Sequence, residues 1–287
     1  MESKQMLEEE IKRIEAWEKE QGGLWFWERI GRLPFKVLDK LTPKFIHEKI
    51  GVLLEELGSY IQTGGKYLTQ DKAIFSLIES KTDTPISSIS DISHIPLEAM
   101  KEASKEHAEK WSTIATLQGA TTGIGGIFTL AIDIPALLGM SLKTLQEIAM
   151  IHGYDPKEKS ERIFIIKCLQ FSSADIVGKQ AILKELSSYY QKENSSYEMM
   201  SQLQGWREVV YTYRDNFGWK KLFQMIPIAG IIFGAITNRS MIHDLTEVGN
   251  MLYRKRRILD RLQSVQKEHS ESSEQKERSE TSEPSPT

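Results

Sequence analysis

The sequence has little that would support disulfide-linked or membrane-spanning architecture. It holds a single cysteine, Cys168, which cannot form an internal disulfide and which fits a reducing compartment. The N-terminal stretch has no basic region followed by an apolar core, so no secretory signal is expected. No uncharged apolar run reaches the length of a standard spanning helix.

Strong charge of one sign and catalytic motifs are also missing. The net charge is −3, which gives no global basic field, so a nucleic-acid partner is not expected. The six histidines are scattered, and the sequence has no HExxH, no paired cysteines and no Gly-x-Ser-x-Gly. We therefore expect no metal and no cofactor, and the sequence leaves open whether the protein is an enzyme.

What the sequence does have is apolar residues at helical spacing along most of its length. Leu7, Ile11, Ile14 and Trp17, for example, form one apolar face. Alternating strand patterns extend over a few residues at most, and the β-branched run at 162–167 is the one ambiguous place. The sequence predicts an all-α protein, a multi-helix bundle built around two Gly-rich apolar helical hairpins.

Changes in composition divide the chain into four parts. Residues 1–80 are predicted to form an N-terminal helical segment that packs on the core, and residues 81–96, rich in Ser, Thr, Asp and Pro, to form a linker. Residues 97–262 would form the main helical core. Residues 263–287 are rich in Ser and Glu and would bury too little apolar surface to offset chain entropy, so this tail is predicted to be disordered.

The first Gly-rich segment spans residues 119–155 and has an apolar middle. A phosphate-binding loop would need a preceding strand and a Gly-Lys-[Ser/Thr] ending, and neither is found. We therefore interpret the glycines as a surface for close helix packing. Within the segment, Asp133 and Pro135 predict a break between two helices at Ile132–Pro135, with Asp133 capping the second helix.

A second segment, residues 218–257, is similar in composition. Its apolar part, residues 222–236, includes Pro227 and several small residues, and it leads into an amphipathic helix. The similarity suggests two halves of a degenerate repeat that pack face to face. The candidates for helix packing are Gly123, Gly126, Gly230 and Gly234.

The sequence leaves open whether the two hairpins, residues 123–142 and 222–236, insert in a membrane or form only core. The second has about 15 apolar residues, short of the roughly 20 that span a bilayer, and Asp133 at the bilayer centre would cost about 2.5–3.5 kcal/mol. A hairpin that dips into one leaflet is still allowed, and downstream cations would then meet anionic headgroups. The alternative is a buried hairpin followed by a solvated basic helix end. The candidate lipid-binding cations are Arg254, Lys255, Arg256, Arg257 and Arg261.

Five polar residues within or beside the apolar segments are candidates for a ligand site or a polar core. If the hairpins enclose a pocket, these side chains could converge there and serve a hydrolase or ligand-binding protein. An Asp133–Arg239 pair across a dry core would instead only fix the packing. The candidates are Asp133, Gln146, Glu147, Asn238 and Arg239.

The segment TTGIGGIFTLAIDIPALLGMSLKTLQEIAMIHGYD resembles the signature of the EcsC family of bacterial proteins. The resemblance lies in a Gly-rich run, an apolar Asp-x-Pro, a Gln-Glu-Ile-Ala helix and a Gly-Tyr-Asp turn, at Gly123, Gly125, Gly126, Asp133, Pro135, Gln146, Glu147, Gly153, Tyr154 and Asp155. The segment IPIAGIIFGAITNRSMIHDLTEVGNML is similar to a second family signature, through Pro227, Gly230, Gly234, Asn238 and Arg239. The resemblance covers residues 40–260.

The resemblance implies a role at a membrane more than it implies a reaction. The family takes its name from a gene beside a two-component ABC transporter that is linked to secretion and to proteolysis within the membrane, and it offers no catalytic residues to carry over. It favours a non-enzymatic protein that binds lipid or a membrane-protein partner, such as an ABC transporter. We expect a cytoplasmic protein that is peripheral at the inner membrane face; its oligomeric state is left open.

Overall fold

The computed structural model describes residues 2–21, 55, 57–64, 71–123, 130–174, 176–190 and 227–280. Within these ranges it contains helices and no strand, which confirms the all-α class that the periodicity predicts. The helices are α1 (Lys4–Glu20), α5 (Asp71–Glu79), α6 (Ile89–Ile92), α7 (Leu97–Gly123), α8 (Leu130–Ile151), α9 (Lys159–Ser173), α10 (Ile176–Tyr190) and α13 (Pro227–Glu280). A helical stretch also covers residues 57–63.

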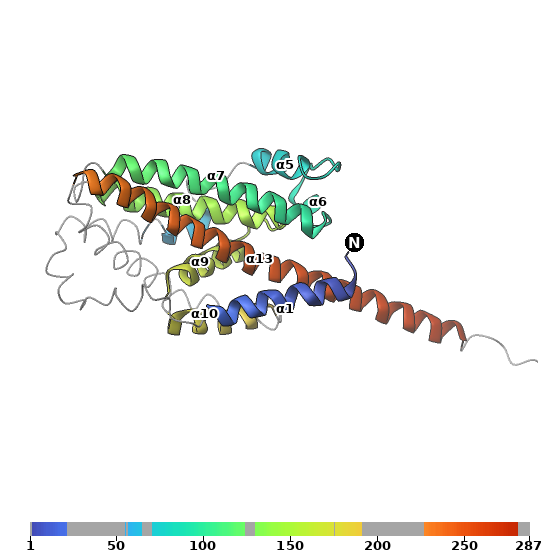
Figure 1. Ribbon diagram of the computed structural model, residues 1–287. Coiled ribbons are helices and arrows are strands. Elements are labelled where there is room, and N and C mark those ends of the chain that lie inside the picture. The colour runs from blue at the N-terminus through green and yellow to red at the C-terminus, as the bar shows by residue number, and fades with distance from the viewer. Residues whose placement is uncertain are drawn as a thin grey trace, which may run out of the picture.

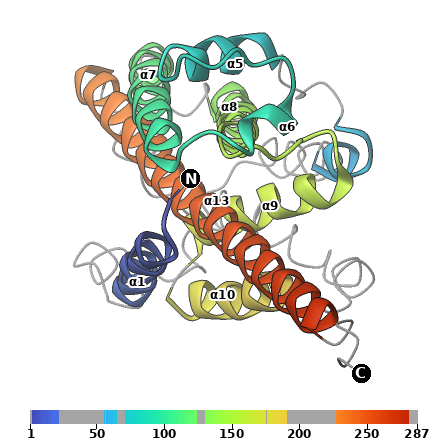
Figure 2. The same ribbon diagram turned by 90° about the vertical axis from the view of Figure 1, so that its right-hand side faces the viewer.

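The long helix α13 is the element on which α1, α7, α8 and α9 pack (Figure 1). It lies along α7 and also contacts α8, α9 and α1. Its first residue is Pro227, and at this position the missing N–H removes no helix hydrogen bond. Figure 2 shows α1 on the other side of α13 from α8. A single helix therefore joins the two sides of the described structure.

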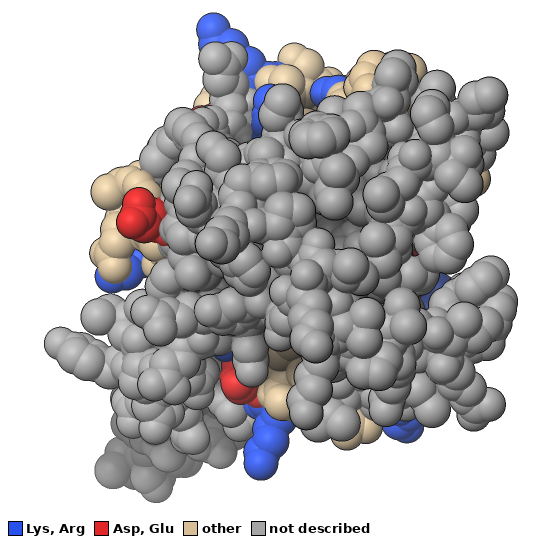
Figure 3. All heavy atoms as spheres, turned by 90° about the vertical axis from the view of Figure 1, so that its left-hand side faces the viewer, with Lys and Arg blue, Asp and Glu red and all other residues tan. Residues whose placement is uncertain are grey.

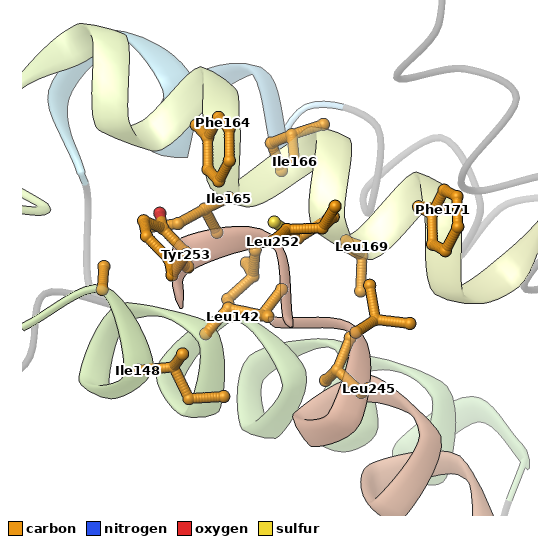
Figure 4. Close-up of a cluster of buried hydrophobic side chains, with 14 of the residues drawn as sticks. Leu142, Ile148, Phe164, Ile165, Ile166, Leu169, Phe171, Leu245, Leu252 and Tyr253 are labelled. Carbon is orange, nitrogen blue, oxygen red and sulfur yellow. The ribbon is translucent and has the colours of Figure 1, made fainter. Parts of the chain in front are cut away.

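The main hydrophobic core lies where α8, α9 and α13 meet (Figure 4). Leu142 of α8, Phe164 and Leu169 of α9, and Leu252 and Tyr253 of α13 are fully buried there. Burying one side chain of this size contributes about 1.5–3 kcal/mol. The three helices are thus held to one another chiefly by apolar packing.

Gly249 allows α13 to approach α8 closely. A Cβ atom on Gly249 would lie 2.8 Å from Leu145 Cδ2 and 3.0 Å from Ile148 Cδ1, so a larger residue would need these side chains to shift. The sequence assigned such a role to other glycines, of which Gly126 lies outside the described residues. For these four a packing role stays a prediction: Gly123, Gly126, Gly230 and Gly234.

The break that the sequence predicts at Ile132–Pro135 is absent, because α8 is one helix that runs through these residues. Pro135 is the sixth residue of α8, just past the first turn, and it lacks the N–H that would bond the carbonyl of Ala131. The helix continues through Pro135 with this one hydrogen bond missing. Asp133 accordingly lies in the first turn of α8 rather than at the start of a second helix.

Residues 81–96 are folded against the core. At the start of α6, the Ser88 hydroxyl accepts a hydrogen bond from the Asp91 N–H, and Asp91 Oδ2 accepts one from the Ser88 N–H at 2.8 Å. Ile86, Ile92 and Ile95 are buried in a second hydrophobic cluster. The Ser, Thr and Asp residues that suggested a linker therefore form caps and turns between α5 and α7.

At its other end α13 continues to Glu280, so residues 263–280 are helical where the sequence predicts disorder. This part extends past the other helices (Figure 1). The physical reason is that a helix already nucleated on the core gains one hydrogen bond for each residue that it adds. The prediction of disorder was based only on how little apolar surface residues 263–287 can bury. A helix that extends from a folded core does not require such burial.

The turn after α8 depends on Gly153, which gives the first testable prediction. Its φ is +77°, and a Cβ atom there would lie 2.9 Å from Arg257 Nη2 and 3.0 Å from the backbone N of Ser93. We expect Gly153→Ala to lower the free energy of unfolding by about 2 kcal/mol, because Ala is strained at positive φ and would displace backbone. Urea unfolding measures the change.

Gly58→Ala is the matched control. Gly58 lies within the helical stretch 57–63, and a Cβ atom there would meet nothing within 4 Å. This substitution is expected to raise the free energy of unfolding by about 0.5–1 kcal/mol, because Ala favours helix over Gly. Equal effects at the two glycines would contradict the assignment of strain to Gly153.

Candidate functional site

The structure places the five polar candidates in different surroundings. Gln146 and Glu147 are buried on α8, and Gln146 Nε2 donates to the carbonyl of Leu142 within the same helix. Asn238 is buried on α13, whereas Arg239 beside it is exposed. Asp133 belongs to α8, and its side chain lies outside the described part of the structure.

Gln146 and Glu147 lie apart from Asn238, and whether Asp133 joins either group stays a prediction. Gly249 of α13 packs beside Leu145 and Ile148 of α8, so Gln146 and Glu147 lie near the height of Gly249 along the α13 axis. Asn238 precedes Gly249 by about three helical turns, a distance of about 16 Å along the helix axis. The buried amide of Asn238 and the buried carboxylate of Glu147 are therefore parts of separate environments.

Glu147 is the centre of a buried polar cluster between α7 and α8. Its Oε2 accepts hydrogen bonds from His107 Nε2 at 2.9 Å and from the Trp111 indole N–H at 2.7 Å. Glu147 is 4% exposed and His107 is 1% exposed. Burial raises the pKa of Glu147, but the hydrogen bonds and the charge of His107 outweigh burial and hold this pKa below its usual value.

Helix geometry explains how two residues of α7 reach one carboxylate. His107 and Trp111 are four residues apart and so lie on the same face of α7, one turn from each other. Around them, Ser104 Oγ, His107 Nδ1 and Thr144 Oγ1 are buried with no hydrogen-bond partner in the described part of the chain. Buried polar atoms of this kind are commonly satisfied by ordered water.

The cluster has one feature of a catalytic site and lacks another. A histidine held by a carboxylate is the arrangement used by general bases. However, His107 Nδ1 has no hydroxyl or thiol within hydrogen-bond reach among the described residues, and the cluster is closed to solvent. The described residues of the whole chain include no group of three His, Cys, Asp or Glu that could hold a metal ion. This geometry favours a structural role for Glu147.

We expect Glu147→Ala to lower the free energy of unfolding by about 3 kcal/mol, because it leaves His107 and Trp111 buried without their acceptor. The control is Glu109→Ala, an exposed position on α7 that should change stability by less than about 0.5 kcal/mol. Chemical unfolding of both variants tests this. A Glu147 variant as stable as the control would show that the cluster does not hold α7 to α8.

The five candidate lipid-binding cations of α13 are engaged within the chain. Four form ion pairs at N–O distances of 2.5–2.7 Å, and each of these cationic side chains is 13–17% exposed. The fifth, Arg257, donates to the carbonyls of His152 and Gly153 at 2.8 and 3.0 Å. The ion pairs are Arg254–Glu10, Lys255–Glu18, Arg256–Glu161 and Arg261–Glu2. The prediction that these cations bind lipid therefore requires that some of the pairs open.

Arg256 connects α9 to α13 through both charge and aromatic rings. Its guanidinium lies 4.0 Å from the ring centroid of Tyr154 and 5.1 Å from that of Phe164. The paired carboxylate, Glu161, is 4% exposed, and burial raises its pKa although Arg256 opposes the shift. The Tyr154 hydroxyl donates to Asp260 Oδ2 at 2.8 Å. Tyr154, Glu161 and Phe164 are buried in this network, so the sequence motif at Tyr154 has a packing role.

His152 is a buried titratable group at the C-terminal end of α8. Its ring stacks on that of Tyr253, with centroids 6.3 Å apart and planes at 6°. Burial, with the charge of Arg257, lowers the pKa of His152 to about 3. In the unfolded chain a histidine titrates near pH 6.5. Between these two values the unfolded state therefore binds a proton that the folded state does not.

This difference predicts a loss of stability in weak acid. The free energy of unfolding should fall by about 1.4 kcal/mol per pH unit as the pH drops below about 6.5. His152→Phe removes the titrating group and keeps an aromatic ring, so its stability should be flatter between about pH 6.5 and about pH 5, where ordinary carboxylates do not titrate. Urea unfolding across this range is the measurement. Parallel curves for the two proteins would contradict the prediction.

Exposed apolar side chains gather at one end of the molecule, where α7 ends and α8 and α13 begin (Figure 1). Leu117 of α7 is 64% exposed and Ile236 of α13 is 63% exposed, and Ile114 of α7 is 36% exposed. Figure 3 looks at this end, and the described Lys and Arg side chains in view lie near its margins. The described parts of both apolar segments, residues 130–142 and 227–236, begin at the same end.

The length of these helices bears on how they could meet a membrane. Among the described residues, the structure has no helix with an apolar stretch that would suffice to cross a bilayer. This agrees with the sequence, in which no such run is expected.

Comparison with known proteins gives a consistent result. The model of the EcsC protein family matches residues 8–258. The chain is 56% identical over 268 residues to "Uncharacterized protein YdbA" of Bacillus subtilis (strain 168), covering 93% of this chain and 98% of that protein. It is 29% identical over 166 residues to "Protein EcsC" of the same organism, covering 58% of this chain and 67% of that protein. No solved structure matches.

Proposed function

The chain belongs to the EcsC protein family, and on that premise we propose that it is a non-enzymatic helical protein that associates with the inner face of the cytoplasmic membrane. The contact is its apolar end, defined by the exposed side chains of Ile114, Leu117 and Ile236. The observation that carries the proposal is the exposure of Leu117 and Ile236 at the end where both apolar segments begin.

Hydrophobic burial supplies the driving force. Single exposed apolar residues are common on soluble proteins, but a group of them at one end of a molecule is typical of an interaction surface. Each large side chain that enters a leaflet contributes about 1.5–3 kcal/mol. Helices too short in apolar length to span would enter the boundary between headgroups and acyl chains.

Charge plays a small part in this contact while the α13 cations remain paired. Arg254 and Lys255 face carboxylates of α1, Arg261 faces that of Glu2 just before α1, and all three cations are largely withdrawn from solvent. Binding through the apolar end should therefore depend little on the charge of the lipid or on salt. This separates it from the electrostatic contact that the basic run of the sequence suggests.

We expect the full chain to float with vesicles of neutral phosphatidylcholine, and Leu117→Glu/Ile236→Glu to reduce the bound fraction about tenfold, because both substitutions place charge in the leaflet. The control is Met6→Glu, at an apolar side chain of α1 that is 57% exposed and lies away from the apolar end. It should bind like the unaltered protein.

Two outcomes would contradict this assignment. Equal loss of binding in the Met6 variant would mean that the apolar end is not the contact surface. Absence of vesicle binding by the unaltered protein would overturn lipid contact through the apolar end and transfer the role of that end to a membrane-protein partner. Circular dichroism checks that all variants keep their helical content.

A further inference from the structure

The helix α1, with Glu2 just before it, covers the basic side of α13 through acidic residues at regular intervals. Glu2 contacts Arg261, Glu10 contacts Arg254, and Trp17 Nε1 donates to Glu247 Oε1 at 2.6 Å. In these three contacts the residue numbers rise along α1 as they fall along α13, so the two helices run antiparallel. Glu18 adds a contact to Lys255, in which both carboxylate oxygens lie within 2.9 Å of Nζ.

Apolar contacts support the same docking. Leu7, Ile14 and Trp17 are buried on the side of α1 that carries Glu10 and Glu18, whereas Glu9 and Glu15 are exposed. The Trp17 ring lies 5.9 Å from that of Phe171. Of the described helices, α13 is the one with which α1 makes extensive contact. The docked helix thus has one side that matches α13 in charge and one side that faces solvent.

We propose that α1 is a strap that covers a binding surface for anionic lipid, formed by Arg254, Lys255 and Arg261 of α13. Release of the strap exposes the cations, and a membrane rich in anionic headgroups then takes the place of the α1 carboxylates. This inference rests on the proposed membrane function, to which it adds regulation by lipid charge.

The contacts in the docked state indicate that the ligand of this surface is an anion. The strap presents carboxylates, one at a time, to cations that are 13–17% exposed, so each cation is arranged to meet an anion from outside the α13 helix. Arg254 and Arg261 are seven residues apart and so lie on one side of the helix, two turns from each other. A surface of anionic headgroups can engage such a row at several points at once.

The remaining two cations of the run are not part of this surface. Arg256 is paired with Glu161 of α9, and Arg257 holds the carbonyls at the end of α8. These partners lie on α9 and at the end of α8, so release of α1 does not remove them. The surface is therefore smaller than the basic run of the sequence, and it is available only in the open state, which lipid binding would favour by population shift.

Charge reversal in the full chain tests the strap. Glu10→Lys/Glu18→Lys replaces two pairs by repulsion, and it should bind vesicles of phosphatidylglycerol and phosphatidylcholine about tenfold more tightly than the unaltered chain at low salt. The gain should disappear at about 0.5 M salt, because screening shortens the reach of these charges. The control is Glu9→Lys/Glu15→Lys, which changes the net charge by the same amount on the exposed side of α1 and should show no gain.

A second variant guards against unfolding as the cause. Adding Arg254→Glu/Lys255→Glu to Glu10→Lys/Glu18→Lys restores opposite charges across the interface, so the gain should be lost while thermal stability recovers. Equal gains in the two double variants, or a gain that survives the charge swap, would overturn the strap. An equal gain for a short DNA duplex would overturn the assignment to lipid.

Binding to neutral vesicles distinguishes a failure of the strap from a failure of the apolar end as a membrane contact. If the unaltered chain binds neutral vesicles but Glu10→Lys/Glu18→Lys gains nothing on anionic ones, the strap fails and the membrane proposal stands. If the unaltered chain binds no vesicles but this variant gains salt-sensitive binding to anionic ones, contact through the apolar end fails and the strap stands.

Discussion

The basic run of α13 is largely withdrawn from solvent, and each of its charges has a partner within the chain. A buried cation without a partner is far more costly than any single apolar contact is favourable. The partners come from four separate parts of the chain: α1, the connection before α7, the end of α8, and α9. The way these parts attach to α13 is therefore set by where its cations are.

Aromatic and backbone groups complete this arrangement where carboxylates are lacking. Arg257 is satisfied by two carbonyls at the end of α8 and lies 4.3 Å from the ring centroid of Tyr154. Burial lowers the pKa of Arg257, but an arginine remains charged because its usual pKa is so high. Lysine at this position would lose the forked geometry that reaches both carbonyls.

Much of the fold could be predicted from the sequence, because helical periodicity and composition are local properties. The all-α class and family resemblance follow from such patterns, and Glu147 was singled out with them. Local patterns could not show that Arg254 and Lys255 are paired with acidic residues and do not form a solvated basic surface. Their partners, Glu10 and Glu18, are separated from them by most of the chain, and local charge patterns do not show which distant acid meets which base.

The helix break at Pro135 fails as a prediction for a related reason. A proline is costly in a helix beyond its first turn, but α8 runs through Pro135, its sixth residue, because packing against other helices can override such local preferences. Gly249 was missed as well, because its role depends on how close α8 lies to it. In each case the deciding quantity is a position in the tertiary structure.

The Arg261–Glu2 contact has a consequence for the order of folding during synthesis. These residues are 259 positions apart, so Glu2 is synthesised long before Arg261. At a translation rate of about 5–20 residues per second, α1 is synthesised on the order of ten seconds or more before its site on α13. During that interval its buried face, with Leu7, Ile14 and Trp17, has no native partner. The acidic residues of α1 keep such a segment soluble until its partner arrives.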